Sequence, residues 1–216
     1  MKKIAVVGSQ GRMGKLICDS LNQKYNVVGI DKYDDLEMAR ESELVIDFSS
    51  GSNSVQTAIW CKEHKTKLII GATGQSQSEL KIIEEASKQI PIMKAGNFSQ
   101  GIVFLKKMLK IMHNKDIENI SIIEMHHKQK KDSPSGTAIE LAKTIETELG
   151  IKPDIFAVRG GEEIGTHEIK IYFGSEVLTI SHQAFSRNAF AQGVMLAAKF
   201  MLKTNQSGLY SFDDLL

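Results

Sequence analysis

The sequence predicts an α/β fold with two domains, one built on a parallel sheet and one an α+β domain with a mostly antiparallel sheet. Three observations lead to this prediction. Over about the first hundred residues, short apolar runs alternate with stretches of helical spacing, as in parallel sheets buried on both faces. A glycine-rich turn separates the first apolar run from the first helical stretch. Beyond residue 115, the strand-like runs alternate apolar with polar residues, which is typical of half-buried antiparallel strands.

The first domain is predicted over residues 1–97. Its strands are expected at 4–7, 26–30, 43–47, 67–70 and 91–93, and helices follow the glycine turn and cover about 52–64 and 76–89. Strand, glycine turn and helix in this order are typical of a Rossmann-like dinucleotide-binding domain.

The second domain is predicted over residues 98–186. A helix over 101–114 is followed by strands at 120–124, 155–158, 167–173 and 176–183, all interpreted as antiparallel. The last two are expected to form a hairpin around Gly174 and Ser175, because glycine accepts the positive φ of a type II′ turn. A helix over 137–149 is expected to begin with a capping box of Thr137 and Glu140.

The C-terminal segment, 187–216, is predicted to contain a helix over about 188–202, followed by a short polar tail. The apolar face of this helix needs a partner and comprises Val194, Leu196, Ala197 and Phe200. We therefore expect the helix to return to the first domain.

The composition excludes several classes of function. The chain has 216 residues, 42% of them hydrophobic and 25% charged, which is ordinary for a globular protein. Its 27 Lys and Arg residues nearly balance 26 Asp and Glu residues, so no basic excess favours a nucleic-acid partner. No apolar run is long enough to span a membrane. The two cysteines, Cys18 and Cys61, have neither metal-ligand nor disulfide-framework spacing, which fits a cytoplasmic location.

The glycine turn is the first candidate site. Gly8, Gly11 and Gly14 follow a strand and begin a helix, and Asp31 follows the next strand. Such glycines let the backbone approach a pyrophosphate, the helix N-terminus offers N–H donors, and the acid can bind a ribose diol. The pattern predicts a nicotinamide dinucleotide site. Gln10 replaces the second glycine of the usual fingerprint, and the alternative is a turn that only packs helix on strand.

Lys32, directly after Asp31, bears on which cofactor binds. An acid at this place favours the free hydroxyl of NAD, and a cation can pair with the 2′-phosphate of NADP. We therefore expect NADH or NADPH to bind, with a solvated surface lysine as the alternative interpretation of Lys32. Phe48 and Ser49, and the segment 71–74, follow further strands and are expected at the same crevice.

A second candidate site is the segment EMHHKQKKDSPSGTA, residues 124–138, which leaves a strand and enters a helix. His126, His127 and three lysines lie beside the helix N-terminus, and all of these favour an anion, so a small acidic substrate is predicted. No cysteine or spaced histidine completes a zinc site with the histidine pair, and no metal is expected. The alternative is a solvated basic loop before a capped helix. The other histidines are interpreted as surface or structural residues: His64, His113, His167 and His182.

Six motifs occur in the order found in one known family: VVGSQGRMG, DFSS, GATG, AGNFSQG, EMHHKQKKDSPSGTA and SHQAFSRNAFAQG. Over nearly the whole chain, the sequence resembles the 4-hydroxy-tetrahydrodipicolinate reductase family, also called dihydrodipicolinate reductases, of diaminopimelate and lysine biosynthesis. The resemblance implies an NAD(P)H-dependent oxidoreductase that reduces (2S,4S)-4-hydroxy-2,3,4,5-tetrahydrodipicolinate to tetrahydrodipicolinate with loss of water. It also implies a homotetramer joined through the sheets of the second domain, which would bind the substrate and mediate oligomerisation.

The resemblance further implies roles for individual residues. His126 and Lys130 match the catalytic pair, with Lys130 as the proton donor. The groups that hold the substrate carboxylates match His127, Gly136 and Thr137. The positions that match the cofactor site are Gly8, Ser9, Gln10, Gly11, Arg12, Met13, Asp31, Lys32, Phe48, Gly71, Ala72, Thr73, Ala95, Gly96, Asn97 and Phe98. Arg187 matches an arginine near the domain junction and is assigned no role.

The chain departs from the family pattern after Asp31. Only about a dozen residues join Asp31 to the third strand, fewer than in many members, which implies a more open adenosine pocket. Two other classes of function stay open at this point. Another nicotinamide enzyme, such as an amino-acid or polyol dehydrogenase, would share the glycine turn without needing Lys130. A non-catalytic redox sensor would bind a dinucleotide and a partner protein without any role for His126.

Overall fold

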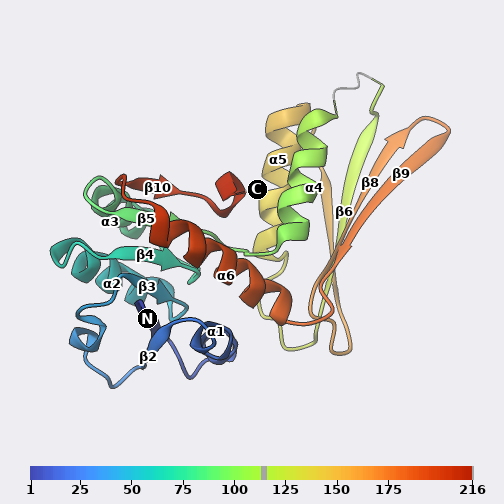
Figure 1. Ribbon diagram of the computed structural model, residues 1–216. Helices are drawn as coiled ribbons and strands as arrows, with labels where there is room; N and C mark the ends of the chain where they lie inside the picture. The colour runs from blue at the N-terminus through green and yellow to red at the C-terminus, as the bar shows by residue number, and fades with distance from the viewer. Residues whose placement is uncertain (113–115, 216) are drawn as a thin grey trace. The chain divides into compact units, whose positions relative to one another are not determined.

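The computed structural model describes residues 1–112 and 116–215, which form two compact units (Figure 1). The first unit comprises Met1–Phe98 and the segment from Phe190 onward, and the second comprises Ser99–Ala189. The predicted domains, 1–97 with 187–216 and 98–186, have slightly different bounds. His113 and the end of the helix predicted over 101–114 lie outside the described residues.

The first unit is built on a six-stranded sheet in the order β10-β5-β4-β3-β1-β2. All its neighbouring strands are parallel, so their carboxyl ends meet at one edge of the sheet. The order in which successive strands join the sheet reverses at β1, which lies between β2 and β3, and ligands of open α/β sheets bind at such a switch in strand order. The strands are β1 Lys3–Val7, β2 Asn26–Ile30, β3 Leu44–Asp47, β4 Lys67–Ile70, β5 Pro91–Lys94 and β10 Gly208–Tyr210.

Helices pack on the two apolar faces of this sheet. Val55 and Ala58 of α2 and Ile83 of α3 share one buried cluster with Ala5 and residues from the neighbouring strands. The caps are local: Ser50 accepts the N–H of Asn53 at α2, and Ser76 forms a capping box with Glu79 at α3. The helices are α1 Arg12–Asn22, η1 Leu36–Ala39, α2 Gly51–Glu63, α3 Gln77–Ser87, α6 Asn188–Lys203 and η2 Phe212–Leu215.

The end of the chain differs from the predicted polar tail. Gly208–Tyr210 pairs in parallel with β5 and forms the edge strand β10. Phe212, which follows it, is fully buried, and its ring centroid lies 5.2 Å from that of Phe98. A strand of three residues is too short to show a period in the sequence, so the prediction missed it.

The second unit carries a four-stranded sheet in the order β7-β6-β8-β9. Its strands are β6 Asn119–His126, β7 Asp154–Arg159, β8 Thr166–Phe173 and β9 Glu176–Gln183. Two helices, α4 Gln100–Ile111 and α5 Gly136–Leu149, join the sheet in one apolar cluster through residues such as Leu105, Leu141 and Ile169. The hairpin of β8 and β9 is confirmed, with Gly174 at φ +62° in its turn.

Two predictions for this unit are wrong. The strand at 155–158 is parallel to β6, not antiparallel, because α5 carries the chain back before β7 begins. The predicted capping box of Thr137 and Glu140 does not form, because Ser135 is the N-cap and accepts the N–H of Ala138. The Glu140 carboxylate instead lies 3.2 Å from the Lys106 ammonium. The fold class itself, a Rossmann-like α/β unit with a second, mostly antiparallel sheet, is confirmed.

Among the residues that the structure describes, no helix combines the length and the apolar character that crossing a membrane requires.

Candidate functional site

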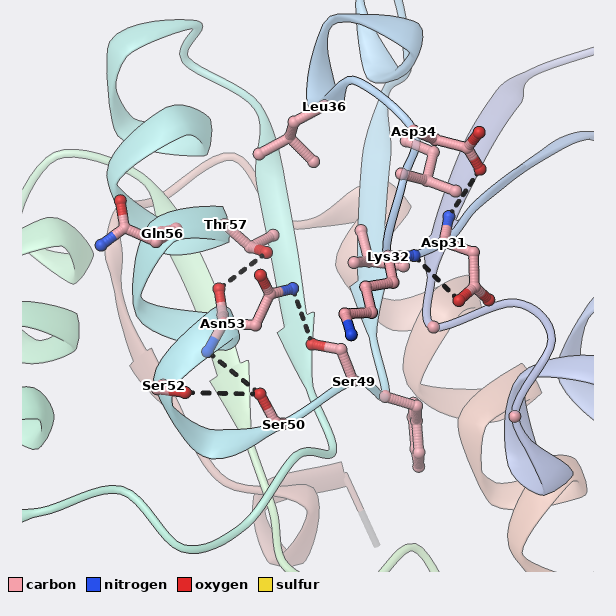
Figure 2. Close-up of a pocket in the computed structure, with 15 residues that line it drawn as sticks. Asp31, Lys32, Asp34, Leu36, Ser49, Ser50, Ser52, Asn53, Gln56 and Thr57 are labelled. Atoms are coloured by element: carbon pink, nitrogen blue, oxygen red, sulfur yellow. Dashed lines mark hydrogen bonds between the residues drawn. The ribbon is translucent and has the colours of Figure 1, made fainter.

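A pocket of about 820 Å³ lies in the first unit, at the carboxyl ends of β1, β2 and β3 (Figure 2). Five residues predicted for the cofactor line it: Gly8, Gly11, Asp31, Lys32 and Phe48. Figure 2 shows Asp31 and Lys32 on one side and the start of α2 on the other. The pocket therefore opens where the strand order switches at β1, and residues that the sequence predicted for a nucleotide line it.

The glycine turn brings backbone close to backbone. Gly8 has φ +80°, and its N–H donates to the Ile30 carbonyl at 2.9 Å. A Cβ at Gly14 would lie 2.0 Å from the Gly8 carbonyl oxygen, so only glycine fits there. Gly11 is the N-cap of α1 and contributes no side-chain cap, which leaves this helix start suited to an anion.

The Asp31 carboxylate is held beside the turn. It accepts the N–H of Gln10 at 2.7 Å and the N–H of Lys32 at 2.8 Å. The Gln10 hydrogen bond is the main reason that the pKa of Asp31 lies below its usual value. The Lys32 side chain is directed into the pocket, and its ammonium lies 5.4 Å from the centroid of the Tyr33 ring. A carboxylate that can accept hydrogen bonds and an ammonium group thus line the same wall.

The opposite wall comes mostly from residues that sequence reasoning missed. Ser49 was expected there from topology, and the other lining residues of this wall are Ser50, Ser52, Asn53, Gln56 and Thr57. The remaining lining residues belong to β1, to β2 and to the segment that follows β2, as Asp31 and Lys32 do: Val7, Ile30, Asp34 and Leu36. The buried Asp47 carboxylate orders this wall by accepting hydrogen bonds from Ser49 and Thr57. Burial raises the pKa of Asp47 despite these bonds. The run of serines directly after a strand that ends in aspartate was the available signal.

The other predicted cofactor residues lie near the same sheet edge but do not line the pocket. Ser9 is buried, and Arg12 and Met13 begin α1. The segments 71–73 and 95–98 follow β4 and β5. Within them, Gly71 faces Phe48, since a Cβ there would lie 2.2 Å from the ring. Phe98 is buried with its ring centroid 5.6 Å from that of Phe48, so it packs against a residue that lines the pocket.

A second cluster, in the second unit, surrounds His126 at the end of β6. Glu124 lies two residues earlier on the same strand and is fully buried. Its carboxylate accepts hydrogen bonds from both terminal nitrogens of Arg159, at 2.8 and 2.6 Å. It also accepts hydrogen bonds from His126 Nδ1 at 2.5 Å and from the N–H of Ser135 at 3.0 Å. Burial acts to raise the pKa of Glu124, but the hydrogen bonds from Arg159, His126 and Ser135 outweigh it and lower the pKa.

Two further histidines join His126. The rings of His126 and His167 meet edge to face with centroids 5.3 Å apart, and those of His167 and His182 are 6.3 Å apart. Burial lowers the pKa of all three, and that of His167 falls to about 3. His167 and His182 were interpreted as scattered residues, but they face one another across the hairpin. The register of the predicted hairpin around Gly174 and Ser175 could have shown this pairing.

Lys130 and the start of α5 complete the cluster. The Lys130 ammonium lies 2.9 Å from Asp132 Oδ1 and is close enough to lower the pKa of His126, after the larger effect of burial. Burial acts to raise the pKa of Asp132, but its contact with Lys130 and the nearby backbone N–H groups outweigh this effect and lower the pKa. His127 donates its N–H to the Glu163 carbonyl at 2.8 Å. The structure therefore gathers His126, Lys130 and the first turn of α5 into one unit.

No group of histidine, cysteine, aspartate and glutamate within the described ranges has the arrangement of a metal site. The second cluster itself combines a partly buried imidazole, an ammonium group and a helix N-terminus. Together they can bind a small anion and move protons.

The chain is similar to known proteins over both units. A family model described as "Dihydrodipicolinate reductase, N-terminus" matches residues 26–98, and one described as "Dihydrodipicolinate reductase, C-terminus" matches residues 101–216. The 4-hydroxy-tetrahydrodipicolinate reductase of Caldanaerobacter subterraneus subsp. tengcongensis is 37% identical over 251 aligned residues, covering 100% of this chain and 98% of that protein. The protein of the same name from Thermosipho africanus is 35% identical over 220 residues, covering 99% and 97%.

Among solved structures, a dipicolinate-bound dihydrodipicolinate reductase from Paenisporosarcina sp. TG-14 has a TM-score of 0.81 at 20% identity and covers 100% of both chains. A myo-inositol dehydrogenase from Corynebacterium glutamicum has a TM-score of 0.67 at 10% identity, covering 96% of this chain and 90% of that one. At these identities the structures show a shared fold.

Proposed function

This chain belongs to the dihydrodipicolinate reductase family, and from this premise we propose that it reduces 4-hydroxy-tetrahydrodipicolinate to tetrahydrodipicolinate, with loss of water and oxidation of NADH or NADPH. The resemblance found in the sequence motifs is thereby confirmed. The observation that carries the proposal is the match to named relatives over the full chain, together with His126, Lys130 and a helix start in one cluster. The reaction belongs to diaminopimelate and lysine biosynthesis.

The pocket of the first unit fits a dinucleotide. The close turn at Gly8 and Gly14 and the uncapped start of α1 suit a pyrophosphate, and the ionised Asp31 suits a ribose diol. Lys32 on the same wall suits a 2′-phosphate, which supports use of both NADH and NADPH. The segments 71–73 and 95–98 extend the site toward the nicotinamide.

The cluster of the second unit fits a small dicarboxylate. We assign His127, Gly136 and Thr137 to the substrate carboxylates, because the first turn of α5 offers N–H donors to an anion. A nicotinamide held by the first unit would supply a hydride to ring carbon 4 once the 4-hydroxyl group has left as water. The reduced ring would then have an enamine-like carbon that must take a proton, and we assign Lys130 as its donor, with His126 beside it.

Two properties of the whole protein belong to the same proposal. The homotetramer would use the sheet of the second unit, where the edge strand β9 leaves Val177 and Leu178 about half exposed. A cytoplasmic location agrees with Cys18 and Cys61, which are both free thiols.

The reaction is tested by generating the substrate in place. Dihydrodipicolinate synthase with pyruvate and aspartate semialdehyde supplies it, and oxidation of NADH and of NADPH is followed separately by absorbance. We expect turnover with both cofactors. No turnover by folded protein that still binds NADH would refute the assignment.

The catalytic pair is tested by His126→Gln and Lys130→Ala. Each should lower kcat by roughly 10² to 10⁴, the usual contribution of a general acid or base. Lys131→Ala is the matched control, because Lys131 is an exposed lysine of the same loop. Equal kcat values in Lys130→Ala and Lys131→Ala would remove Lys130 from the mechanism.

A further inference from the structure

We propose that Glu124 is the positioning residue of this site: it fixes the ring orientation and tautomer of His126 and ties the start of α5 to the same point. The inference rests on the proposed function, in which His126 and the first turn of α5 act on the substrate. Glu124 itself is fully buried, and we assign it no contact with the substrate.

The geometry joins three parts of the second unit through one carboxylate. His126 belongs to β6, Arg159 ends β7, and Ser135 caps α5. All three donate to the Glu124 carboxylate, Arg159 through both of its terminal nitrogens. Because the acceptor is shared, a displacement of Glu124 would move the imidazole and the helix start together.

The same carboxylate specifies which nitrogen of His126 carries the proton. An ionised carboxylate only accepts hydrogen bonds, so the nitrogen 2.5 Å from it, Nδ1, must be the donor. The lowered pKa of Glu124 keeps this carboxylate ionised. A neutral His126 therefore presents Nε2 with its lone pair, which makes Nε2 the atom available for proton transfer.

Gly165 keeps space beside that nitrogen. A Cβ at position 165 would lie 3.0 Å from His126 Nε2, closer than most real contacts. The backbone of Gly165 does not have a positive φ, so conformation does not require glycine at this position. Space at Nε2 is the remaining physical reason for glycine, and it supports Nε2 as the working atom.

Arg159 neutralises the charge of the buried Glu124 carboxylate. Its guanidinium pairs with both oxygens of Glu124, so the group of Glu124, Arg159 and neutral His126 carries no net charge. Burying the Glu124–Arg159 ion pair costs desolvation energy, so the pair contributes little to stability. Holding the His126 imidazole in one tautomer, in contrast, bears directly on proton transfer.

The test uses the full-length chain and two readouts. Long-range ¹H–¹⁵N correlation spectra report which ring nitrogen is protonated, and the signals of His126 are identified by their loss in His126→Gln. We expect His126 to be the Nδ1–H tautomer in the unaltered protein. In Glu124→Gln, whose amide also has hydrogen-bond donors, we expect a mixture of tautomers and a kcat lower by roughly 10- to 100-fold, as for other residues that orient histidines. The KM for NADH should not change, because its pocket lies in the first unit.

Glu168→Gln is the matched control. Glu168 lies on β8, one position from His167, so it points to the opposite face of the same sheet, where it pairs with Lys170. It should change neither the His126 tautomer nor kcat.

The outcomes are separable. An Nε2–H tautomer in the unaltered protein overturns the inference without any variant, so it stays testable if Glu124→Gln does not fold. A folded Glu124→Gln with unchanged tautomer and kcat also overturns it. Absence of turnover by the unaltered protein would instead refute the proposed function, and the tautomer spectrum would still decide how Glu124 acts on His126.

Discussion

Replacing His167 by phenylalanine should change how the stability of the protein depends on pH. His167 is 3% exposed, and burial, with the neighbouring His126 and His182, lowers its pKa from 6.5 to about 3. Between these two values the unfolded chain binds one more proton at this residue than the folded chain does. The free energy of unfolding therefore falls as the pH falls, by about 1.4 kcal/mol per pH unit for this residue.

The expected magnitude follows from this slope. Between pH 6.5 and about pH 5, the titration of His167 should lower the free energy of unfolding by about 2 kcal/mol. Phenylalanine does not titrate, so the variant lacks this loss. At about pH 7.5 the variant should be less stable by about 1 kcal/mol, because it loses the hydrogen bond between His167 Nε2 and Ser135 Oγ. At about pH 5 it should be the more stable protein by a similar amount.

The free energy of unfolding of both proteins is measured at a series of pH values by urea unfolding followed by circular dichroism. Because the chain has two units, hydrogen exchange of the β8 amides is needed to report on the second one. Ser135→Ala is the control for the titration: it removes the same hydrogen bond, together with the N-cap of α5, but keeps the titrating ring. A difference between His167→Phe and the unaltered protein that stays constant from pH 7.5 to 5 would refute the reasoning.

Two further predictions concern the nucleotide pocket. Gly14→Ala places a Cβ 2.0 Å from the Gly8 carbonyl oxygen and should weaken NADH binding at least about tenfold, measured by fluorescence titration. Gly160→Ala is the control and should not weaken binding, because a Cβ at Gly160 meets nothing within 4 Å. Equal affinities of the two variants for NADH would show that the turn can adjust. Lys32→Ala should raise the KM for NADPH roughly tenfold and leave the KM for NADH unchanged, because only NADPH has the 2′-phosphate. An equal rise in KM for both cofactors would argue against pairing of Lys32 with the 2′-phosphate.

The parts of the fold that were predicted are those with a local signal. The glycine turn, the buried strands and the hairpin each show their pattern within about ten residues. The parallel pairing of β7 was missed because strand direction depends on the path of α5, not on the residues of the strand. The cap of α5 was misplaced because both Ser135 and Thr137 have hydroxyl groups at positions where a helix can begin, and only the structure shows that Ser135 accepts the N–H of Ala138.

The residues of the candidate site were likewise predicted only where a local sequence pattern indicated them. His126 and Lys130 were found because they lie in one short segment with a recognisable helix start. Glu124 belongs to that segment too, but its role depends on Arg159, which lies 35 residues further along the chain. The hairpin register pairs His167 with His182, but their place beside His126 depends on the pairing of β6 with β8, a contact between strands that no local pattern specifies.

The burial of these histidines bears on how the proposed reaction divides its proton transfers. Burial, with repulsion from Lys130 and Arg159, lowers the pKa of His126 in spite of its bond to Glu124, so the imidazole is neutral at neutral pH. A neutral imidazole with Nδ1 bound to a carboxylate can accept a proton at Nε2 but has none to give there. The Lys130 ammonium, held 2.9 Å from Asp132, does carry protons. For the proposed reaction, this assigns the donor role toward the substrate carbon to Lys130 and an acceptor role to His126.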